Sequence, residues 1–392
     1  MNIMFQFDDP IIQSSGGVER VTDTLAKEFI NRGHNVIFLC NQKMNLINET
    51  TILSAPQYYI NLEDKDKTRI KKELQIICSK HNIQILINQI SNRKTLLVTD
   101  CLPEHIRVIT VVHTQPFFAD NITRRRLFRM KSANPKQFLF KIASILNINI
   151  YKNFFNNLCI ENLNLILDNS DKVCLISERF IPRIQKHIPD VQTSKLVAIN
   201  NPNTFSHTNI DYQEKENIIM WVGRVENTGK NTIDFIRTWD ILSRSNTDWK
   251  AIVVGDGPDL EYNKEYCRKN EIINIEFVGN VRNIEDYYKK AKFIAVTSWS
   301  ESWCMVLTEG MSFGCIPFAY NTYETLHDII DNGINGYIVE ANVNSLSNCI
   351  QTMLNNKDKQ STISRNAIEK SKEFTSDKIV KKWEYLMNSV IN

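Results

Sequence analysis

Short apolar runs alternate with helical patterns along this chain, and this alternation restricts its fold more than any other feature. The runs "NIMFQF" and "NVIFLC" are separated by a stretch in which apolar side chains recur every three or four residues: Val18, Val21, Leu25 and Phe29. Because an α-helix turns once every 3.6 residues, this spacing predicts a helix with one buried face. A buried strand, an amphipathic helix and a second buried strand are typical of a parallel βαβ unit.

The same alternation continues through most of the 392 residues in two series. In the first series, the runs that predict strands include "IQILINQ", "IRVITVVH", "DKVCLIS" and "KLVAIN". A polar segment near residues 205–217 predicts a linker, and the second series begins with "IIMWVGRV". We therefore predict an α/β protein with two Rossmann-like, doubly wound parallel-sheet domains, residues 1–205 and 206–372. The last helical segment, residues 373–392, is expected to pack back on the N-terminal domain.

Composition is that of an ordinary globular protein, with 42% hydrophobic and 23% charged residues. No apolar run approaches the roughly 18 residues that would span a membrane, and the first residues lack the basic segment of a signal peptide. The nine cysteines include no CxxC pair, which favours buried free thiols in a reducing compartment. We therefore expect a cytoplasmic protein. The histidines show no metal-ligand spacing, so no metal site is predicted.

Charge is unevenly distributed along the chain. Residues 1–200 carry 26 Lys and Arg against 18 Asp and Glu, and residues 121–160 carry eight basic residues and no acidic one. A basic face on one domain indicates an anionic partner, although no nucleic acid is expected. One hypothesis is that the segment docks on an anionic membrane surface, the inner face of the cell membrane, and positions a lipid-linked acceptor there. The alternative is a helical hairpin with a solvated basic face.

Three charged or titratable side chains stand at expected strand ends, where α/β sheets place their ligands. Arg224 and Lys230 follow the strand "IIMWVG", and both can reach a phosphate there. His113 ends the apolar strand "IRVITVVH". The alternatives are two solvated charges and a structural histidine.

The segment "SESWCMVLTEG" holds two glutamates, Glu301 and Glu309, around a nearly apolar run. Eight helical residues rotate by about 800°, which leaves the two side chains about 80° apart, so they do not share one face of a helix. We predict that the helix begins between them, around Trp303–Met305. The free N–H groups of its first turn would then form an anion site beside Glu301. The alternative is that Glu301 only complements the helix dipole and that Glu309 is a solvated helix residue.

Several motifs resemble one known family when they are taken in order. They are "SGGVERV…LAKEFINRGHNV", "VVHTQ", "WVGRVENTGK", "VVGDGP", "FVGNV", "ESWCMVLTEGMSFGCIP" and "DNGINGYIV". Together they are similar to the retaining glycosyltransferases of family 4, of the bacterial polysaccharide or lipopolysaccharide type. The resemblance is weakest at about 40–105 and 115–165. It implies the GT-B fold, in which two Rossmann-like domains face each other across a cleft.

The resemblance implies a role for each matching position. Glu309 would hold the ribose hydroxyls of the donor, and Glu301 the hydroxyls of the transferred sugar. The diphosphate would meet Arg224 and Lys230, with Gly16 and Gly17 approaching it from the other domain. His113 would lie beside the anomeric carbon. The remaining expected contacts are made by backbone: Val281 at the base, and Trp303, Cys304 and Met305 at the sugar and phosphate.

The implied mechanism is metal-independent. Arg224, Lys230 and the helix N-terminus would stabilise the charge that develops on the leaving diphosphate. Retention would proceed by attack on the same face, with a donor phosphate oxygen taking the acceptor's proton, so no nucleophile is assigned. The chain departs from the family pattern at three places, where Cys304 replaces the usual glycine, Asn231 follows Lys230 instead of glycine, and Gly310 follows Glu309 instead of alanine.

The sequence thus predicts a hexosyltransferase for cell-surface polysaccharide, capsule or lipopolysaccharide synthesis. The donor would be a UDP-sugar, with a GDP-sugar as the alternative, and the transferred group a hexose or N-acetylhexosamine; no other cofactor is expected. The acceptor would be a saccharide or a lipid-linked oligosaccharide. A GT-B nucleotide-sugar epimerase and a non-catalytic nucleotide-sugar-binding protein remain alternatives. A dehydrogenase is disfavoured, because G-x-G-x-x-G is absent after the first strand.

Overall fold

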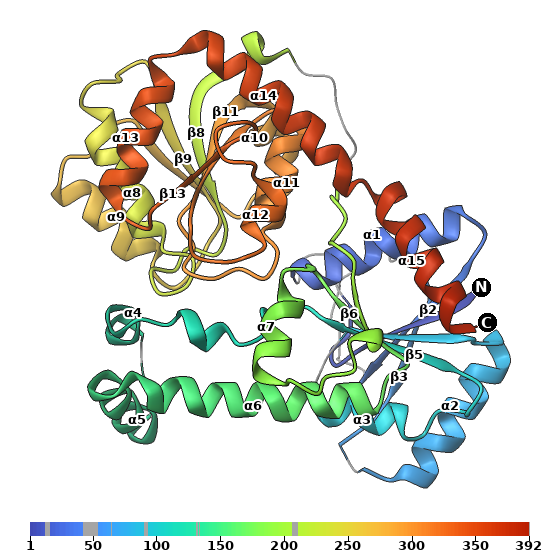
Figure 1. The fold of residues 1–392 in the computed structure, drawn as a ribbon. Helices are drawn as coiled ribbons and strands as arrows, with labels where there is room; N and C mark the ends of the chain where they lie inside the picture. Colours follow the sequence, from blue (N-terminus) through green and yellow to red (C-terminus); the bar gives the residue numbers. More distant parts are fainter. Residues whose placement is uncertain are drawn as a thin grey trace. The chain divides into compact units, whose positions relative to one another are not determined.

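The computed structural model describes residues 1–11, 16–41, 54–63, 65–89, 93–130, 132, 134–205 and 211–391, without the side chains of residues 93–95, 125 and 129 (Figure 1). The expected linker lies partly outside these residues, as does Ser15 of the expected glycine loop. The chain divides into two compact units. The first comprises Met1–Asp120, Lys152–Thr204 and Thr375–Asn392, and the second comprises Asn121–Tyr151 and Phe205–Phe374.

The first unit is built on a seven-stranded parallel sheet with the strand order β3-β2-β1-β4-β5-β6-β7. Its strands are β1 (Asn2–Phe7), β2 (Asn35–Asn41), β3 (Gln57–Ile60), β4 (Ile85–Asn88), β5 (Arg107–Val112), β6 (Lys172–Leu175) and β7 (Leu196–Ala198). Its helices are α1 (Gly17–Asn31), α2 (Lys67–His81), α3 (Arg93–Thr99), α7 (Phe180–His187) and α15 (Ser376–Ile391), with 3-10 turns at Phe118–Asn121 and Thr193–Lys195. The long helix α6 (Ile148–Asp168) runs from the second unit into this one.

The core of the first unit confirms the helical face predicted from sequence. Val21, Leu25 and Phe29 of α1 are buried, and the Phe29 ring packs 6.3 Å from that of Phe5 in β1, centroid to centroid. Each such side chain contributes about 1.5–3 kcal/mol when it leaves water. The last helix, α15, also belongs here, because its Glu384 carboxylate contacts Arg32 at 3.0 Å and His34 at 2.9 Å.

The second unit contains a six-stranded parallel sheet with the order β10-β9-β8-β11-β12-β13. Its strands are β8 (Glu216–Val222), β9 (Lys250–Val254), β10 (Ile275–Gly279), β11 (Ala291–Val296), β12 (Ile316–Tyr320) and β13 (Tyr337–Val339). Its helices are α4 (Arg124–Arg129), α5 (Pro135–Leu146), α8 (Thr232–Ser243), α9 (Leu260–Lys269), α10 (Glu285–Lys290), α11 (Met305–Ser312), α12 (Leu326–Ile329), α13 (Val343–Leu354) and α14 (Lys357–Ser371), with 3-10 turns at Tyr212–Glu214 and Lys372–Phe374.

Two glycines allow the loops after β8 and β9 to lie against each other. A Cβ at Gly255 would lie 1.9 Å from the carbonyl oxygen of Gly223, and a Cβ at Gly257 would lie 2.4 Å from that of Val225. Gly255 also has φ +127°, which other residues rarely adopt. The backbone at the carboxyl edge of the second sheet therefore approaches too closely for any side chain at these two positions.

Candidate functional site

The clearest polar contact at the carboxyl edge of the second sheet joins two residues singled out from sequence. The Lys230 ammonium donates hydrogen bonds to both carboxylate oxygens of Glu301, at 2.7 and 2.9 Å. Lys230 lies in the loop after β8, and Glu301 lies in the loop after β11. These strands are neighbours in a parallel sheet, so the two loops begin side by side at the same edge.

Backbone and side-chain hydrogen bonds hold these two loops together. The amide of Trp299 donates to the carbonyl of Gly229 at 2.9 Å, and the Asn231 side chain donates to the carbonyl of Thr297 at 3.2 Å. Asn231 is fully buried with φ +55°. Asparagine is among the few residues other than glycine that adopt this left-handed conformation readily. The departure from the family's glycine at this position is therefore accommodated by the backbone.

The Lys230–Glu301 pair is partly shielded from water. Burial alone would lower the pKa of Lys230, but the Glu301 carboxylate beside it raises that pKa above its ordinary value. Lys230 therefore carries a positive charge at neutral pH. Arg224, by contrast, extends into solvent with 69% of its side chain exposed, and it reaches Glu226 only at 3.8 Å. The structure thus places one cation against a carboxylate and leaves the other at the surface.

Helix α11 begins at Met305, as predicted, so that Glu301 stands in the loop before it and Glu309 within it. Cys304 occupies the N-cap position, and no side chain caps the first turn. The thiol is buried, and burial raises the pKa of Cys304 to about 12. Trp303 is also buried and packs edge-on against Phe374, with ring centroids 5.1 Å apart.

Glu309 is buried, with only 1% of its surface exposed, so the alternative of a solvated helix residue is wrong. The hydroxyl of Tyr288 in α10 donates to a Glu309 carboxylate oxygen at 3.0 Å. The Tyr288 ring stacks on Phe313 at 5.8 Å and is itself fully buried. Sequence reasoning did not find Tyr288. Its only signal was an aromatic pair in the short helix "IEDYYKK", which is equally typical of core packing.

A buried lysine fixes the end of the helix that carries Tyr288. The Lys215 ammonium donates to the backbone carbonyls of Tyr288 and Ala291, both at 2.7 Å, and of Lys289 at 3.1 Å. These carbonyls lie at the C-terminus of α10, where a cation is favoured by unpaired acceptors and by the helix dipole. Burial lowers the pKa of Lys215. Sequence reasoning missed this residue too, because a lysine before a strand predicts a solvated charge.

His113 lies in the first unit, directly after β5. Its Nε2 is hydrogen-bonded to the side-chain oxygen of Gln89, which follows the neighbouring strand β4. Burial lowers the pKa of His113 to about 4, so the ring is neutral at pH 7. Its Nδ1 is buried and has no hydrogen-bond partner among the described residues, and the same holds for Nε2 of the nearby Gln115. This edge of the first sheet therefore has unused polar atoms that a polar ligand could satisfy.

The other predicted positions are less distinctive. Gly17 begins α1, and Gly16 precedes it; a Cβ at Gly17 would meet nothing within 4 Å. Val281 follows β10 and is partly buried against the apolar cluster that contains Tyr288 and Phe313. The structure therefore gathers Lys230, Glu301 and residues 303–305 at one place in the second unit, while the two glycines and His113 belong to the first.

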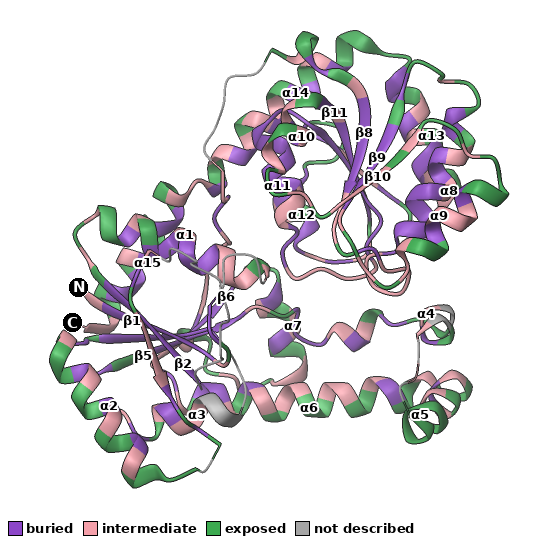
Figure 2. Ribbon diagram, turned by 180° about the vertical axis from the view of Figure 1, so that it is seen from behind, coloured by how far each residue is buried: buried purple, intermediate pink, exposed green. Residues whose placement is uncertain are grey.

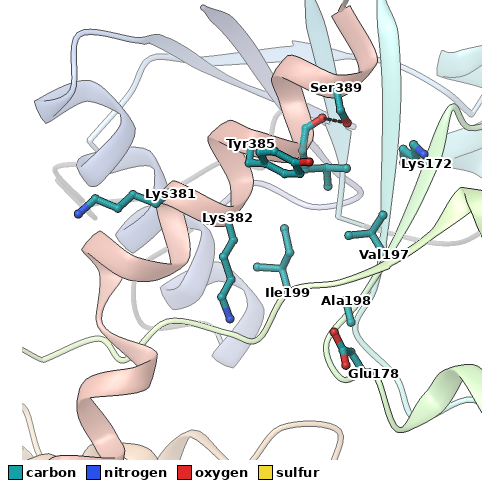
Figure 3. A pocket seen from close by; sticks show the side chains of 10 residues that line it. Lys172, Glu178, Val197, Ala198, Ile199, Lys381, Lys382, Tyr385 and Ser389 are labelled. Atoms are coloured by element: carbon teal, nitrogen blue, oxygen red, sulfur yellow. Dashed lines mark hydrogen bonds between the residues drawn. The ribbon is translucent and has the colours of Figure 1, made fainter.

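Two further observations define what the described residues offer elsewhere. Among them, no three His, Cys, Asp or Glu side chains are grouped so that they could hold a metal ion. A groove of about 670 Å³ lies between β7 and α15, with Lys172, Lys382 and Tyr385 among its lining residues (Figure 3). This groove contains none of the residues predicted from sequence.

Comparison with known proteins gives consistent relatives. Residues 203–370 match the family model described as glycosyl transferases group 1. The chain is 28% identical over 229 residues to a Campylobacter jejuni GalNAc-alpha-(1->4)-GalNAc-alpha-(1->3)-diNAcBac-PP-undecaprenol alpha-1,4-N-acetyl-D-galactosaminyltransferase, a match that covers 58% of this chain and 60% of that enzyme. It is also 21% identical over 383 residues to an uncharacterized glycosyltransferase of Haemophilus influenzae, covering 96% and 97% of the two chains.

Solved structures show the same fold over nearly the whole chain. The Anabaena protein Alr3699/HepE, crystallised with UDP and glucose, superposes with a TM-score of 0.71 at 15% identity and covers 99% of this chain and 100% of its own. The lipopolysaccharide outer core galactosyltransferase WaaB superposes with a TM-score of 0.67 at 16% identity, covering 99% of each chain. The predicted fold class, GT-B with two Rossmann-like parallel-sheet domains, is confirmed.

Proposed function

Since this chain is a group 1 glycosyltransferase through residues 203–370, we propose that it is a retaining enzyme which transfers a hexose or N-acetylhexosamine from a nucleoside diphosphate sugar. The donor is a UDP-sugar, with a GDP-sugar as the alternative. The acceptor is a saccharide or a lipid-linked oligosaccharide of cell-surface polysaccharide synthesis. No metal ion takes part in the transfer.

The contact between Lys230 and Glu301 carries this proposal. It puts a cation and a carboxylate together at the carboxyl edge of a parallel sheet, where such folds bind ligands. A donor sugar presents the complementary pair of groups, an anionic diphosphate and a set of neutral hydroxyls. On donor binding, Lys230 turns to the diphosphate and Glu301 accepts hydrogen bonds from the sugar hydroxyls.

The leaving diphosphate gains negative charge as the glycosidic bond breaks, and three groups are available to stabilise it. These are Lys230, the solvent-exposed guanidinium of Arg224, and the uncapped first turn of α11, in which Met305 is the first residue. Preorganised donors of this kind contribute about 3–4 kcal/mol each to transition-state stabilisation. The proton of the acceptor hydroxyl moves to a donor phosphate oxygen, so the mechanism assigns no nucleophilic side chain.

The nucleoside is held by Glu309, whose carboxylate accepts hydrogen bonds from the ribose hydroxyls. The Tyr288 hydroxyl holds this carboxylate in place from the buried side. The backbone at Val281 meets the base, in the loop after β10. UDP is favoured because the structurally similar Anabaena protein was crystallised with UDP and with UDP-glucose.

The acceptor side rests on the first unit. His113 is neutral at pH 7 and has one unpaired ring nitrogen, so it serves as a hydrogen-bond partner for a sugar hydroxyl and not as a cation. Gly16 and Gly17 precede and open α1, whose N-terminus supports the diphosphate from this side. A lipid-linked acceptor is favoured because the Campylobacter relative acts on an undecaprenol-linked glycan.

A panel of nucleotides tests the proposal. Thermal shift and calorimetry would be run with UDP, GDP, UDP-glucose, UDP-N-acetylglucosamine and GDP-mannose, each with EDTA and with Mg²⁺. We expect one nucleoside diphosphate to stabilise the protein by several degrees with the same dissociation constant in both buffers. The preferred donor should be hydrolysed slowly, and NMR of the first product should show retained anomeric configuration. If no nucleoside diphosphate binds, or if binding needs the metal, the proposal is wrong.

A further inference from the structure

Exposed apolar side chains are concentrated in one short part of this molecule. Among the described residues, fifteen large apolar side chains are exposed, and eight of them lie within residues 128–158. They are Phe128, Phe138, Leu139, Ile142, Leu146, Ile150, Phe154 and Leu158. Single exposed apolar residues need no explanation, but such a concentration marks a surface that binds something.

Four of these residues form a continuous stripe on α5. At 100° per residue, Phe138, Ile142, Leu146 and Leu139 fall within an arc of about 100°. The opposite face of the helix packs inward, because Ser144 is buried and the Phe140 ring lies 6.1 Å from that of Tyr151. Figure 2 shows most of α5 exposed. The apolar stripe of this amphipathic helix therefore faces solvent, the reverse of its usual orientation.

The hairpin of α4 and α5 is held together without using the stripe's side chains. The Lys141 ammonium donates to the carbonyl of Met130 at 2.6 Å, and Arg124 donates to the backbone carbonyl of Leu146 at 3.3 Å. Asn134 caps α5 through the amide of Gln137 at 2.9 Å. The apolar side chains of the stripe are thus free of any role in keeping the hairpin folded.

A second stripe of the same kind lies on α6. Ile150, Phe154 and Leu158 are spaced by four residues and occupy an arc of about 80°. Phe128 of α4 is also exposed, and Lys141 lies 5.8 Å above its ring. We name these eight exposed side chains the apolar surface.

The charge around the apolar surface is of one sign. Residues 121–160 contain eight Lys and Arg and no Asp or Glu. Of the basic residues whose side chains the structure describes, Arg124 and Lys136 are exposed, and Lys152 is partly exposed. Interfaces between proteins are depleted in lysine, whereas helices that lie in a membrane interface combine exposed apolar residues with Lys and Arg. This combination complements a surface of anionic headgroups over acyl chains.

We propose that the apolar surface of α4, α5 and α6 docks this protein on an anionic lipid membrane, with its side chains entering the headgroup and acyl boundary. The basic residues around it contact the lipid phosphates and add an attraction that salt weakens. Among the described residues, no helix is long and apolar enough to cross a membrane. The docking is independent of the donor chemistry, because it involves none of the residues assigned to the donor.

Vesicle flotation tests the proposal with the full chain. We expect binding to vesicles of 70% phosphatidylcholine and 30% phosphatidylglycerol, at least tenfold weaker binding to pure phosphatidylcholine, and at least fivefold weaker binding at 500 mM than at 50 mM salt. No sugar nucleotide is added. A failure of vesicle binding therefore leaves the proposed transferase activity untouched, and loss of that activity would leave vesicle binding unchanged.

Matched variants identify the surface. Leu139→Ser/Leu146→Ser should weaken vesicle binding at least tenfold, because two side chains that are 66% and 75% exposed would no longer leave water. Ile76→Ser/Tyr385→Ser removes side chains that are 60% and 80% exposed elsewhere on the molecule, and it should bind like the wild type. Lys136→Gln/Lys152→Gln should reduce the salt dependence. Circular dichroism and the nucleotide thermal shift verify that each variant is folded.

Two results would overturn the proposal. The first is equal flotation of both apolar double variants, which would place the membrane contact elsewhere. The second is a concentration-dependent dimer in sedimentation analysis that Leu139→Ser/Leu146→Ser abolishes, which would show that a second copy of the chain covers the apolar surface.

Discussion

The Nζ atom of Lys230 lies 2.7 Å from one carboxylate oxygen of Glu301 and 2.9 Å from the other. Each residue follows its own strand, and the two strands are neighbours in the second sheet. The pairing neutralises both side chains in the ligand-free protein. A donor must therefore compete with Glu301 for Lys230, and this competition makes the consequences of the two substitutions opposite in sign.

Glu301→Gln should leave UDP binding unchanged or tighter and should lower kcat by about 10²–10³-fold, because the sugar loses a hydrogen-bond acceptor in the transition state. Lys230→Met should instead weaken UDP at least tenfold. Calorimetry and a UDP-release assay measure the two effects separately. Glu285→Gln, which breaks the surface pair with Lys289, is the control and should change neither quantity. Equal loss of UDP affinity in both site variants would contradict the assigned roles.

Tyr288→Phe should lower the free energy of unfolding by about 1.5–3 kcal/mol, because it removes a hydrogen bond to the buried Glu309 carboxylate. We also expect UDP to bind several-fold more weakly, since the carboxylate that holds the ribose is no longer fixed. Urea unfolding and calorimetry measure these effects. The adjacent Tyr287→Phe is a matched control, because Tyr287 is only partly buried in the same cluster. An unchanged UDP affinity in Tyr288→Phe would show that Glu309 does not depend on this hydrogen bond.

Most of the fold was predictable from local patterns, since the strands and the amphipathic faces depend on residues close in sequence. The start of α11 between the two glutamates was also predictable, because the helical rotation between positions 301 and 309 excluded one continuous face. The contact of Lys230 with Glu301 was not, since it depends on β8 and β11 being neighbours although two strands separate them in the chain. The roles of Tyr288 and Lys215 were hidden for the same reason.

Lys215→Met should destabilise the second unit by about 3 kcal/mol, because it leaves buried carbonyls at the end of α10 without a donor. The loss should also depend on pH. Burial lowers the pKa of Lys215 below its ordinary 10.5, so the unfolded chain binds more protons than the folded one just below that pH. Wild-type stability therefore rises, relative to that of the variant, as the pH is raised towards 10.5.

Urea unfolding of the wild type and of Lys215→Met at pH 7 and pH 9.5 measures this difference. The control is Lys250→Met, which breaks an exposed pair with Glu216 and should change the free energy of unfolding by less than about 1 kcal/mol at either pH. A stability difference between wild type and Lys215→Met that narrows at pH 9.5 would contradict a lowered pKa.

His113 predicts a pH dependence in the acid range. Burial lowers its pKa from 6.5 to about 4, so the unfolded chain takes up a proton below pH 6.5 while the folded chain does not. Stability from this group is present above pH 6.5 and is lost as the pH falls towards 4, by about 3 kcal/mol in total. His113→Gln removes the titrating ring, so its free energy of unfolding should fall less than that of the wild type over this range, and the exposed His105→Gln should behave like the wild type. Parallel pH profiles for the wild type and His113→Gln would mean that the ring is already protonated at neutral pH, and that its proposed role as a neutral partner for a sugar hydroxyl is wrong.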